Sequence, residues 1–293
     1  MIAHRKKSVG GGLAELRTVL AAEAVTDPLW YEVSKSRKAT KRARAALKDG
    51  AELVFVWGGD GMVQRCLDAL SGSKTTVAIV PAGTANLLAS NLGVPHDLSE
   101  AVRIGFHGRR RKLDLGVVNG EHFAVMAGVG FDAAMIRDAD RALKSRLGRL
   151  AYVWTGLRNV SGTASRMRVT VDGDTWFRGK AGCLLLGNVG TITGGVRAFP
   201  KARPDDGWLD VGVTTARNPL QWARALGRMA FGRAERSPLI RITRGREIRV
   251  RLANPMPYEL DGGARGDITR LSARVVPDAV TVRVPPADGG EVA

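Results

Sequence analysis

Cysteine is scarce in this sequence: the 293 residues contain only Cys66 and Cys183, which lie far apart in apolar surroundings. Two such residues cannot supply the disulfide framework of a small secreted domain, nor a zinc site built on cysteine. The four histidines are scattered and lack the spacing of metal ligands. A disulfide scaffold and a zinc protein are therefore excluded.

Long hydrophobic runs are also missing. The longest weakly polar stretch, 123–136, is interrupted by Asp132 and is too short to span a bilayer. The basic start Met1–Lys7 is not followed by an apolar run, so it does not resemble a signal peptide. We therefore expect a cytoplasmic protein, with peripheral association at the inner face of the membrane left open.

Acidic residues are outnumbered: 45 Lys and Arg stand against 28 Asp and Glu, a net charge of +17. Such a chain is attracted to polyanions, which include nucleic acid, anionic lipid headgroups and nucleotide phosphates. Charge alone does not choose among them. Aromatic residues make up only 5% and form no paired stacking platform, which counts against sequence-specific RNA binding.

The first third of the sequence alternates between strand and helix patterns. Short apolar runs at 53–57 and 76–80 are typical of strands buried on both faces of a parallel sheet. Helical periodicity follows or precedes them at 13–23, 38–48, 62–70 and 84–92. This order predicts an open α/β domain, which binds ligands at the carboxyl ends of its strands.

After about residue 112 strand patterns dominate, and we expect a β-rich second domain. The expected strands are 112–118, 121–129, 166–171, 181–188, 208–214, 247–252, 258–260, 272–276 and 279–284. Two helical stretches, 133–159 and 219–232, interrupt them, and residues 285–293 are expected to form a loose tail.

Two glycine turns stand between an expected strand and an expected helix. In Gly58–Met62, adjacent glycines allow close backbone approach, and the helix start favours an anion. Asp60 suits such a turn if Mg²⁺ offsets its charge; a turn merely capped by Asp60 is the local alternative. In Pro81–Asn86, Thr84 is expected to cap the next helix and to hold phosphate, which makes this turn half of a nucleotide cradle.

A third glycine run, Gly10–Gly12, follows Lys6 and Lys7 at the start of the first helix, a pattern that suits a triphosphate or simply a flexible terminus. No Walker A pattern occurs, which disfavours a P-loop fold. Gly128–Ala133 fits the dinucleotide fingerprint, but it lies among antiparallel-looking strands and is expected to be a packed turn rather than part of an oxidoreductase.

Taken in order, these motifs resemble the soluble diacylglycerol kinase family of lipid kinases. The resemblance rests on Gly58–Gly61, Pro81–Asn86, Asn119–Gly120 to Asp132–Ala133, Asp205–Val211 and Asp261–Gly262, which span nearly the whole chain. It extends to sphingosine and ceramide kinases and to the NAD kinase fold. It implies an α/β domain at 1–112, a β-sandwich domain at 113–270, a segment 271–293 that returns to the first domain, and ATP bound in the cleft between the domains.

The resemblance also implies a set of site residues. The implied nucleotide contacts are Lys6, Lys7, Ser36, Gly58, Gly59, Asp60, Gly61, Met62, Gly83 and Thr84. Asp206, with the backbone carbonyls of Arg203 and Trp208, matches a structural Mg²⁺ site, and Asp261 matches the aspartate of the family's Asp-Gly-Glu turn.

This sequence departs from the family pattern at three places. Met62 stands where a threonine is usual, and Gly263 stands where the family has the glutamate that acts as general base. The first strand is nearly absent, and its usual phosphate loop is replaced by Ala3–Ser8. Three alternatives follow from Gly263: Asp261 or Glu259 acts as the base instead, the substrate hydroxyl is activated in another way, or the protein is catalytically weak.

The expected function is transfer of the γ-phosphoryl group of ATP, with Mg²⁺, to the hydroxyl of diacylglycerol or a related lipid. Asp60 and Asp261 are the expected catalytic carboxylates. A kinase of a sphingoid base or NAD, a catalytically weak nucleotide-binding protein, and a basic nucleic-acid-binding protein remain as alternatives.

The expected partner is a lipid at an anionic membrane surface, with no specific nucleic acid, and a homodimer is left open. The basic surplus fits docking, since each Lys or Arg near such a surface contributes roughly 1 kcal/mol. The candidate docking elements are the run Arg109–Lys112 and an apolar stripe on the expected helix between 143 and 157, which is also the pattern of a core helix.

Overall fold

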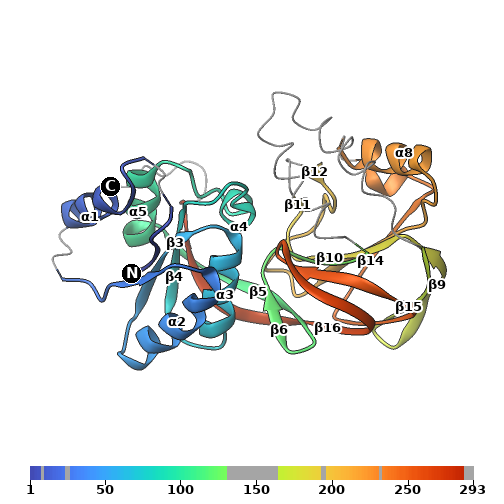
Figure 1. Cartoon of the computed structure of the whole chain (residues 1–293), viewed down its shortest axis with the longest axis horizontal. Coiled ribbons are helices and arrows are strands. Elements are labelled where there is room, and N and C mark those ends of the chain that lie inside the picture. Colours follow the sequence, from blue (N-terminus) through green and yellow to red (C-terminus); the bar gives the residue numbers. More distant parts are fainter. Residues whose placement is uncertain (8–9, 24–26, 131–163, 193–195, 231–232, 287–293) are drawn as a thin grey trace. The chain divides into compact units, whose positions relative to one another are not determined.

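The computed structural model describes residues 1–7, 10–23, 27–130, 164–192, 196–230 and 233–286 (Figure 1). The chain divides into two compact units. Unit 1 contains residues 1–114 and 278–293, and unit 2 contains residues 115–277. The helix expected at 133–159, with its apolar stripe, lies outside the described residues.

Unit 1 is built on a parallel sheet. Its four strands run in the order β2–β1–β3–β4, with bounds β1 Ile2–His4, β2 Tyr31–Val33, β3 Leu53–Gly58 and β4 Thr76–Pro81. Every residue of β4 is buried, as is all of β3 after its first residue, which explains their continuous apolar sequences. The open α/β domain expected from the sequence is confirmed.

Helices cover both faces of this sheet. They are α1 Gly12–Ala22, α2 Ala39–Lys48, α3 Asp60–Leu70, α4 Leu87–Asn91 and α5 Leu98–His107. In α2, Ala39, Ala43 and Ala46 are buried, while most of its basic side chains are exposed. Helices α2 and α3 pack together on one side of the sheet, and α1 and α5 pack together on the other (Figure 1).

The strand order places a topological switch between β1 and β3. The chain leaves β1 for β2 on one side, then returns to form β3 on the other side of β1, with Ile2 opposite Val56. The connections that follow β1 and β3 therefore turn away from each other at the carboxyl edge of the sheet. Such a point is where open α/β sheets bind their ligands.

The end of the chain completes unit 1. Strand β16, Gly263–Val284, begins in unit 2, and its last part pairs in parallel with β4, with Thr281 opposite Thr76. The backbone N–H of Asp278 donates to Oδ1 of Asp114, 2.9 Å away, within the strand β5, Arg109–Val118. The return of the chain thus begins at residue 278, whereas the sequence suggested 271.

Unit 2 is a β-sandwich of antiparallel strands. Its longer strands, besides the shared β5 and β16, are β6 Glu121–Phe123, β7 Met126–Val129, β8 Ser165–Val171, β9 Asp174–Ala181, β10 Cys183–Gly187, β13 Leu209–Thr214, β14 Ile240–Gly245 and β15 Glu247–Leu260. Strands β11 Thr191–Ile192 and β12 Val196–Arg197 pair antiparallel with each other, and α8 spans Pro219–Ala230.

Strand β15 joins the two layers of the sandwich. Its first half pairs with β8, with Val250 opposite Val169, and its second half pairs with β7, with Glu259 opposite Gly128. A register shift between Arg251 and Met256 separates the halves. One layer is therefore β9–β8–β15–β16, and the other is β15–β7–β10–β13–β14.

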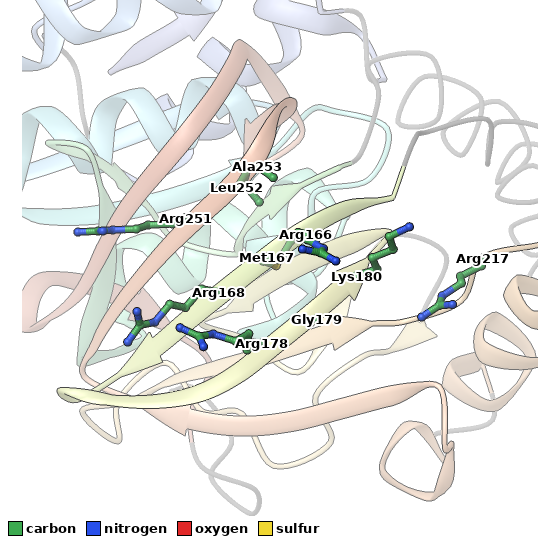
Figure 2. Close-up of a pocket in the computed structure, with 10 residues that line it drawn as sticks. All are labelled: Arg166, Met167, Arg168, Arg178, Gly179, Lys180, Arg217, Arg251, Leu252 and Ala253. Atoms are coloured by element: carbon green, nitrogen blue, oxygen red, sulfur yellow. The ribbon is translucent and has the colours of Figure 1, made fainter.

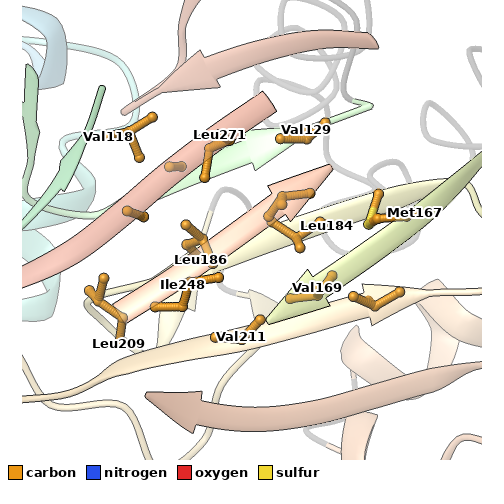
Figure 3. Packing of buried hydrophobic residues seen from close by; sticks show 14 of the residues in the cluster. Val118, Val129, Met167, Val169, Leu184, Leu186, Leu209, Val211, Ile248 and Leu271 are labelled. Atoms are coloured by element: carbon orange, nitrogen blue, oxygen red, sulfur yellow. The ribbon is translucent and has the colours of Figure 1, made fainter. Parts of the chain in front are cut away.

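Alternating side chains fill the space between the layers (Figure 3). Met167, Val169 and Ile248 come from the first layer, and Leu184 and Val211 from the second. Each is at most 2% exposed. The alternation of buried and exposed residues in β8 and the first half of β15 follows from this single buried face.

Several strand boundaries differ from expectation. The stretch 121–129 was expected as one strand, but it is divided into β6 and β7, because the amides between them bond to a side chain rather than to a neighbouring strand. The closing segments join into the long strands β15 and β16. Helix α5 and strands β9 and β14 were not expected.

Candidate functional site

The two glycine turns expected to hold nucleotide are in contact. Strands β3 and β4 pair with Gly58 opposite Pro81, so both turns follow at the same edge of the sheet. The N–H of Ala82 donates to the carbonyl of Gly58 at 2.9 Å. A Cβ on Gly83 would lie only 2.6 Å from Gly59 Cα, so this approach of the two backbones requires glycine.

Asp60 joins the helices that follow the two turns. It is the first residue of α3, and its Oδ1 accepts a hydrogen bond from the N–H of Leu88, 3.3 Å away, in the first turn of α4. The carboxylate is partly exposed. It therefore stands at the edge of the glycine turns, where it can meet a bound cation or its waters.

Thr84 is not the helix cap predicted from the sequence, because α4 begins only at Leu87. The side chain of Asn86 folds back on the turn: its Oδ1 accepts from the N–H of Gly83 at 2.8 Å, and its Nδ2 donates to the carbonyl of Gly83 at 3.0 Å. These bonds hold the backbone out of the helix, with Asn86 itself in the left-handed region. Thr84 is left exposed.

Met62 contributes to the site through packing. Its side chain is 1% exposed and lies against Gly58, where an added Cβ would be 2.7 Å from the Met62 sulfur. Its N–H donates to the carbonyl of Gly59 at 2.9 Å. Where the family usually has a threonine hydroxyl, this chain thus has a buried apolar side chain that packs against the turn.

The basic residues after β1 lie at the same edge of the sheet. Lys6 is exposed and Lys7 half-buried, directly after the end of β1 beside β3. Ser36 follows β2, the next strand outward, in a short 3-10 turn. At the start of α1, the N–H of Gly11 donates to Glu15 Oε2, 2.5 Å away, so a carboxylate already occupies this helix terminus.

Unit 1 therefore gathers most of the expected nucleotide contacts on one edge. They follow β1 (Lys6, Lys7), β2 (Ser36), β3 (Gly58, Gly59, Asp60, Gly61) and β4 (Gly83, Thr84). The donor set is suited to phosphate, with backbone at close approach, hydroxyls and two ammonium groups. The role of Asn86 in holding the turn together was not predicted from the sequence, although an asparagine just before an apolar helix is a recognisable signal for a turn.

The contact between the turns gives a stability prediction. Gly83→Ala should lower the free energy of unfolding by about 1–3 kcal/mol, because the new Cβ meets Gly59 Cα and Asn86 Oδ1. Gly61→Ala is the matched control: no atom of the described residues lies within 4 Å of its added Cβ, and the alanine should raise stability by up to about 1 kcal/mol in α3. Urea denaturation measures both, and equal stability of the two variants would contradict the contact.

In unit 2, Asp261 anchors the backbone between β6 and β7. It is 6% exposed, with φ of 46°. Its Oδ2 accepts from the N–H of Ala124 at 2.8 Å, and its Oδ1 accepts from the N–H groups of Val125 and Met126, both at 2.9 Å. Both carboxylate oxygens are therefore already engaged by buried amides, a structural role that the sequence did not reveal.

Glu259, two residues earlier, is fully buried. Its Oε2 accepts from the N–H of Gly262 at 2.7 Å, whereas Oε1 has no hydrogen-bond partner among the described residues. Burial raises the pKa of this carboxyl to about 8, and repulsion from Asp261 adds to the effect.

Next to Gly263, the position of the family's glutamate, lies the guanidinium of Arg265. It forms a bidentate pair with Glu121, at 2.5 Å and 2.9 Å, and a Cβ on Gly263 would come 2.5 Å from Arg265 Nη1. A glutamate at 263 would therefore require Arg265 to move. In this structure the Arg265–Glu121 pair occupies the space next to residue 263.

The buried Glu259 makes stability depend on pH. The unfolded chain releases this proton near pH 4.5, but the folded protein keeps it to about pH 8, so between these values the group lowers stability by about 1.4 kcal/mol per pH unit. Glu259→Gln removes the titration and keeps an acceptor for Gly262. Its advantage over the native chain should be near zero at about pH 4 and about 4 kcal/mol by pH 8, measured by urea denaturation; a constant difference across this range would rule out the shifted carboxyl.

The loop with the expected Mg²⁺ ligands is closed by its own aspartate. Asp206 Oδ1 accepts from the N–H of Trp208 at 3.1 Å, and Arg203 pairs with Asp205 at 3.6 Å. A carboxylate with two backbone carbonyls is an oxygen donor set that suits Mg²⁺. No group of three His, Cys, Asp or Glu side chains that could hold a metal occurs in the described part of the chain.

The fingerprint-like turn at Gly128 is not part of a βαβ unit. Strand β7 lies between the antiparallel strands β10 and β15. The N–H of Gly130 donates to the carbonyl of Pro257 at 2.8 Å, and its φ of 86° requires glycine. Gly128 and Val129 thus end strand β7 and Gly130 bends the chain after it, while Phe131–Ala133 lie outside the described residues, so the packed turn expected here stays a prediction.

Comparison with known families assigns both halves of the chain. The family model described as "Diacylglycerol kinase catalytic domain" matches residues 7–118, and the one described as "YegS C-terminal NAD kinase beta sandwich-like domain" matches residues 124–284. A "Probable lipid kinase YegS-like" of Pseudomonas aeruginosa is 30% identical over 97% of this chain and 93% of its own. The chain belongs to the diacylglycerol kinase and YegS-like lipid kinase family.

Other similarities agree with this membership. A diacylglycerol kinase of Bacillus subtilis is 29% identical over 76% of this chain and 75% of its own. A crystal structure of a putative diacylglycerol kinase from Bacillus anthracis superposes with a TM-score of 0.80 at 23% identity, covering 97% of this chain and 95% of that one. The resemblance and the fold class inferred from the sequence are confirmed, and the kinase family makes the protein a phosphotransferase.

A more distant structure shares the fold. An NAD kinase from Archaeoglobus fulgidus, solved in complex with ATP, has a TM-score of 0.50 at 12% identity over 96% of this chain and 92% of that one.

Among the helices that the structure describes, none combines the length and the hydropathy needed to span a bilayer.

Proposed function

We propose that this protein is an ATP-dependent lipid kinase that phosphorylates the hydroxyl of diacylglycerol or a related lipid. The observation that carries the proposal is the pair of touching glycine turns after β3 and β4, next to the topological switch between β1 and β3, with Asp60 at their edge. Membership in a family whose relatives are named diacylglycerol kinase and lipid kinase supports it. ATP binding by the Archaeoglobus NAD kinase, which shares the fold, supports the choice of nucleotide.

The residues of unit 1 would hold the nucleotide by its phosphates. The backbone of Gly58, Gly59, Gly61 and Gly83 provides the close approach, while Lys6 and Lys7 supply positive charge and Ser36 and Thr84 supply hydroxyls. Mg²⁺, when bound, would neutralise charge on the phosphates. Asp60 would orient that cation or its waters, so that positioning and charge neutralisation provide most of the catalysis.

Asp261 remains the proposed acceptor of the hydroxyl proton, because it matches the aspartate of the family's Asp-Gly turn. Its three backbone hydrogen bonds mean that accepting a proton competes with holding residues 124–126 in place. A loose phosphoryl-transfer transition state needs little proton transfer. A carboxylate that mainly positions the substrate hydroxyl is therefore sufficient. Asp206, with the carbonyls of Arg203 and Trp208, is proposed as a structural Mg²⁺ site in unit 2.

The acceptor distinguishes the main alternatives. A sphingoid base or NAD would use the same phosphate-binding edge, since the NAD kinase shares the fold. Incubation with labelled ATP, Mg²⁺ and a panel of diacylglycerol, sphingoid base and NAD, followed by product identification, tests the proposal. A labelled lipid phosphate is expected; label only in NADP, or no product at all, would overturn it.

We propose that the protein is cytoplasmic and that it associates peripherally with the inner face of the membrane by electrostatic attraction. Of the expected run Arg109–Lys112, Arg109 Nε donates to the carbonyl of Pro285 at 3.1 Å, and Lys112 forms an ion pair with Asp278 at 2.9 Å. Half of this run is therefore engaged in holding the end of the chain to unit 1.

A further inference from the structure

Strand pairing in unit 2 aligns four arginines in one row. Arg270 of β16 lies opposite Arg251 of β15, Arg251 lies opposite Arg168 of β8, and Arg168 lies opposite Arg178 of β9. Directly opposite residues of antiparallel strands point to the same face, and all four are exposed. The sequence gives no hint of this row, because its members are up to 102 residues apart.

A second row lies beside the first. Arg166 of β8 is opposite Lys180 of β9, two residues along each strand from Arg168 and Arg178. We call the six residues of the two rows the arginine face: Arg166, Arg168, Arg178, Lys180, Arg251 and Arg270. Figure 2 shows five of them over neighbouring strands, with Arg168 beside Arg178. These five line a groove of about 800 Å³ together with Arg217.

The six cations of the arginine face are not paired with acids among the described residues. In the ranges that the structure describes, none of its six cations forms an ion pair with a carboxylate. Arg168 donates to the hydroxyl of Thr175, at 2.8 Å and 3.2 Å. Like charges directly opposite in a sheet are destabilising, so this arrangement lowers the stability of the fold slightly. A bound anion would relieve the repulsion.

We propose that the arginine face is the surface by which the protein docks on membranes containing anionic phospholipids. The proposal rests on the proposed function, because a lipid acceptor lies in a membrane. A broad sheet face of guanidinium groups presents bidentate donors to many lipid phosphates at once. Leu220, the second residue of α8 and three residues after Arg217, is 62% exposed, and an exposed apolar side chain of this kind can enter the headgroup region of a bilayer.

Nucleic acid is the other polyanion that such a face attracts. Binding of single strands depends on aromatic side chains on which bases stack. The arginine face contains none, and the nearest aromatic residues of β9, Trp176 and Phe177, pack against the core of the sandwich. The face therefore lacks the platform for nucleic acid, whereas a lipid surface needs only charge and area.

The test compares two triple variants with the same loss of charge. Arg168→Gln, Arg178→Gln and Arg251→Gln together remove the centre of the arginine face. Lys41→Gln, Arg44→Gln and Lys48→Gln, on the exposed side of α2, are the matched control. The first triple removes like-charge repulsion, so its melting temperature should equal or exceed that of the native chain, which separates docking from folding.

Vesicles of phosphatidylcholine with 30% phosphatidylglycerol serve as the membrane in a sedimentation assay. The arginine-face triple should bind about 100-fold more weakly than the native chain, since three charges contribute roughly 1 kcal/mol each, and the control triple should bind within a few-fold. Equal weakening by both triples would show that only net charge matters and would overturn the proposal. Undiminished binding by the arginine-face triple would overturn it as well.

Two further measurements separate docking on lipid from nucleic-acid binding and from the kinase activity itself. Loss of binding to a single-stranded oligonucleotide by the arginine-face triple, with vesicle binding intact, would assign the face to nucleic acid and overturn the proposal. Kinase assays use diacylglycerol both in the vesicles and in nonionic detergent micelles. The arginine-face triple should lose activity on vesicles alone. Vesicle binding that depends on the arginine face, together with no lipid phosphorylation by the native chain, would support docking while refuting the kinase.

Discussion

Replacing Asp60 by alanine is expected to reduce ATP-dependent lipid phosphorylation about 100- to 1,000-fold. Asp60 is the one carboxylate among the proposed nucleotide contacts, at the edge of the touching glycine turns. Removing a preorganised electrostatic group from a phosphoryl-transfer site has effects of this size. The measurement is the initial rate of labelled lipid phosphate formation at saturating ATP and Mg²⁺.

The alanine also removes the bond from the N–H of Leu88 to Asp60 Oδ1, so it tests structure and charge together. Asp60→Asn separates them, because its amide oxygen still accepts that bond while the charge is lost. We expect Asp60→Asn to melt within a few degrees of the native chain and to be nearly as inactive as the alanine variant. An active Asp60→Asn would show that no cation is oriented by this residue.

Asp261→Ala is expected to lower the free energy of unfolding by about 3–5 kcal/mol, a large part of the stability of an ordinary domain. The alanine leaves the N–H groups of Ala124, Val125 and Met126 without their buried acceptor. Each such orphaned donor costs about 1–3 kcal/mol. Urea denaturation measures the loss.

Asp267→Ala on the exposed part of β16 is the control for Asp261→Ala, and it should change stability by less than about 0.5 kcal/mol. Asp261→Asn can still accept two of the three bonds and should fold. If Asp261 takes the substrate proton, Asp261→Asn lowers turnover more than nucleotide affinity. A variant that loses only nucleotide affinity would remove Asp261 from the chemistry.

Local sequence was informative wherever neighbours in the chain determine the structure. The apolar runs of β3 and β4 predicted buried parallel strands, and the glycines after them predicted turns that approach a ligand. The family resemblance depended on the same short motifs. Thr84 was misjudged as a cap because the bonds of Asn86 to Gly83 compete with the helix, and their strength depends on how the turn is packed.

The sequence by itself determined the class of each half, the edge of the sheet that holds the two glycine turns, and the excess of positive charge. These follow from periodicity, glycine spacing and composition, which are local or additive properties. The tertiary structure decided that Gly59 and Gly83 touch, that Asp261 holds three distant amides, and that four arginines from β9, β8, β15 and β16 stand in one row. Strand register brings such residues together, and register depends on the packing of the whole sandwich rather than on any one segment.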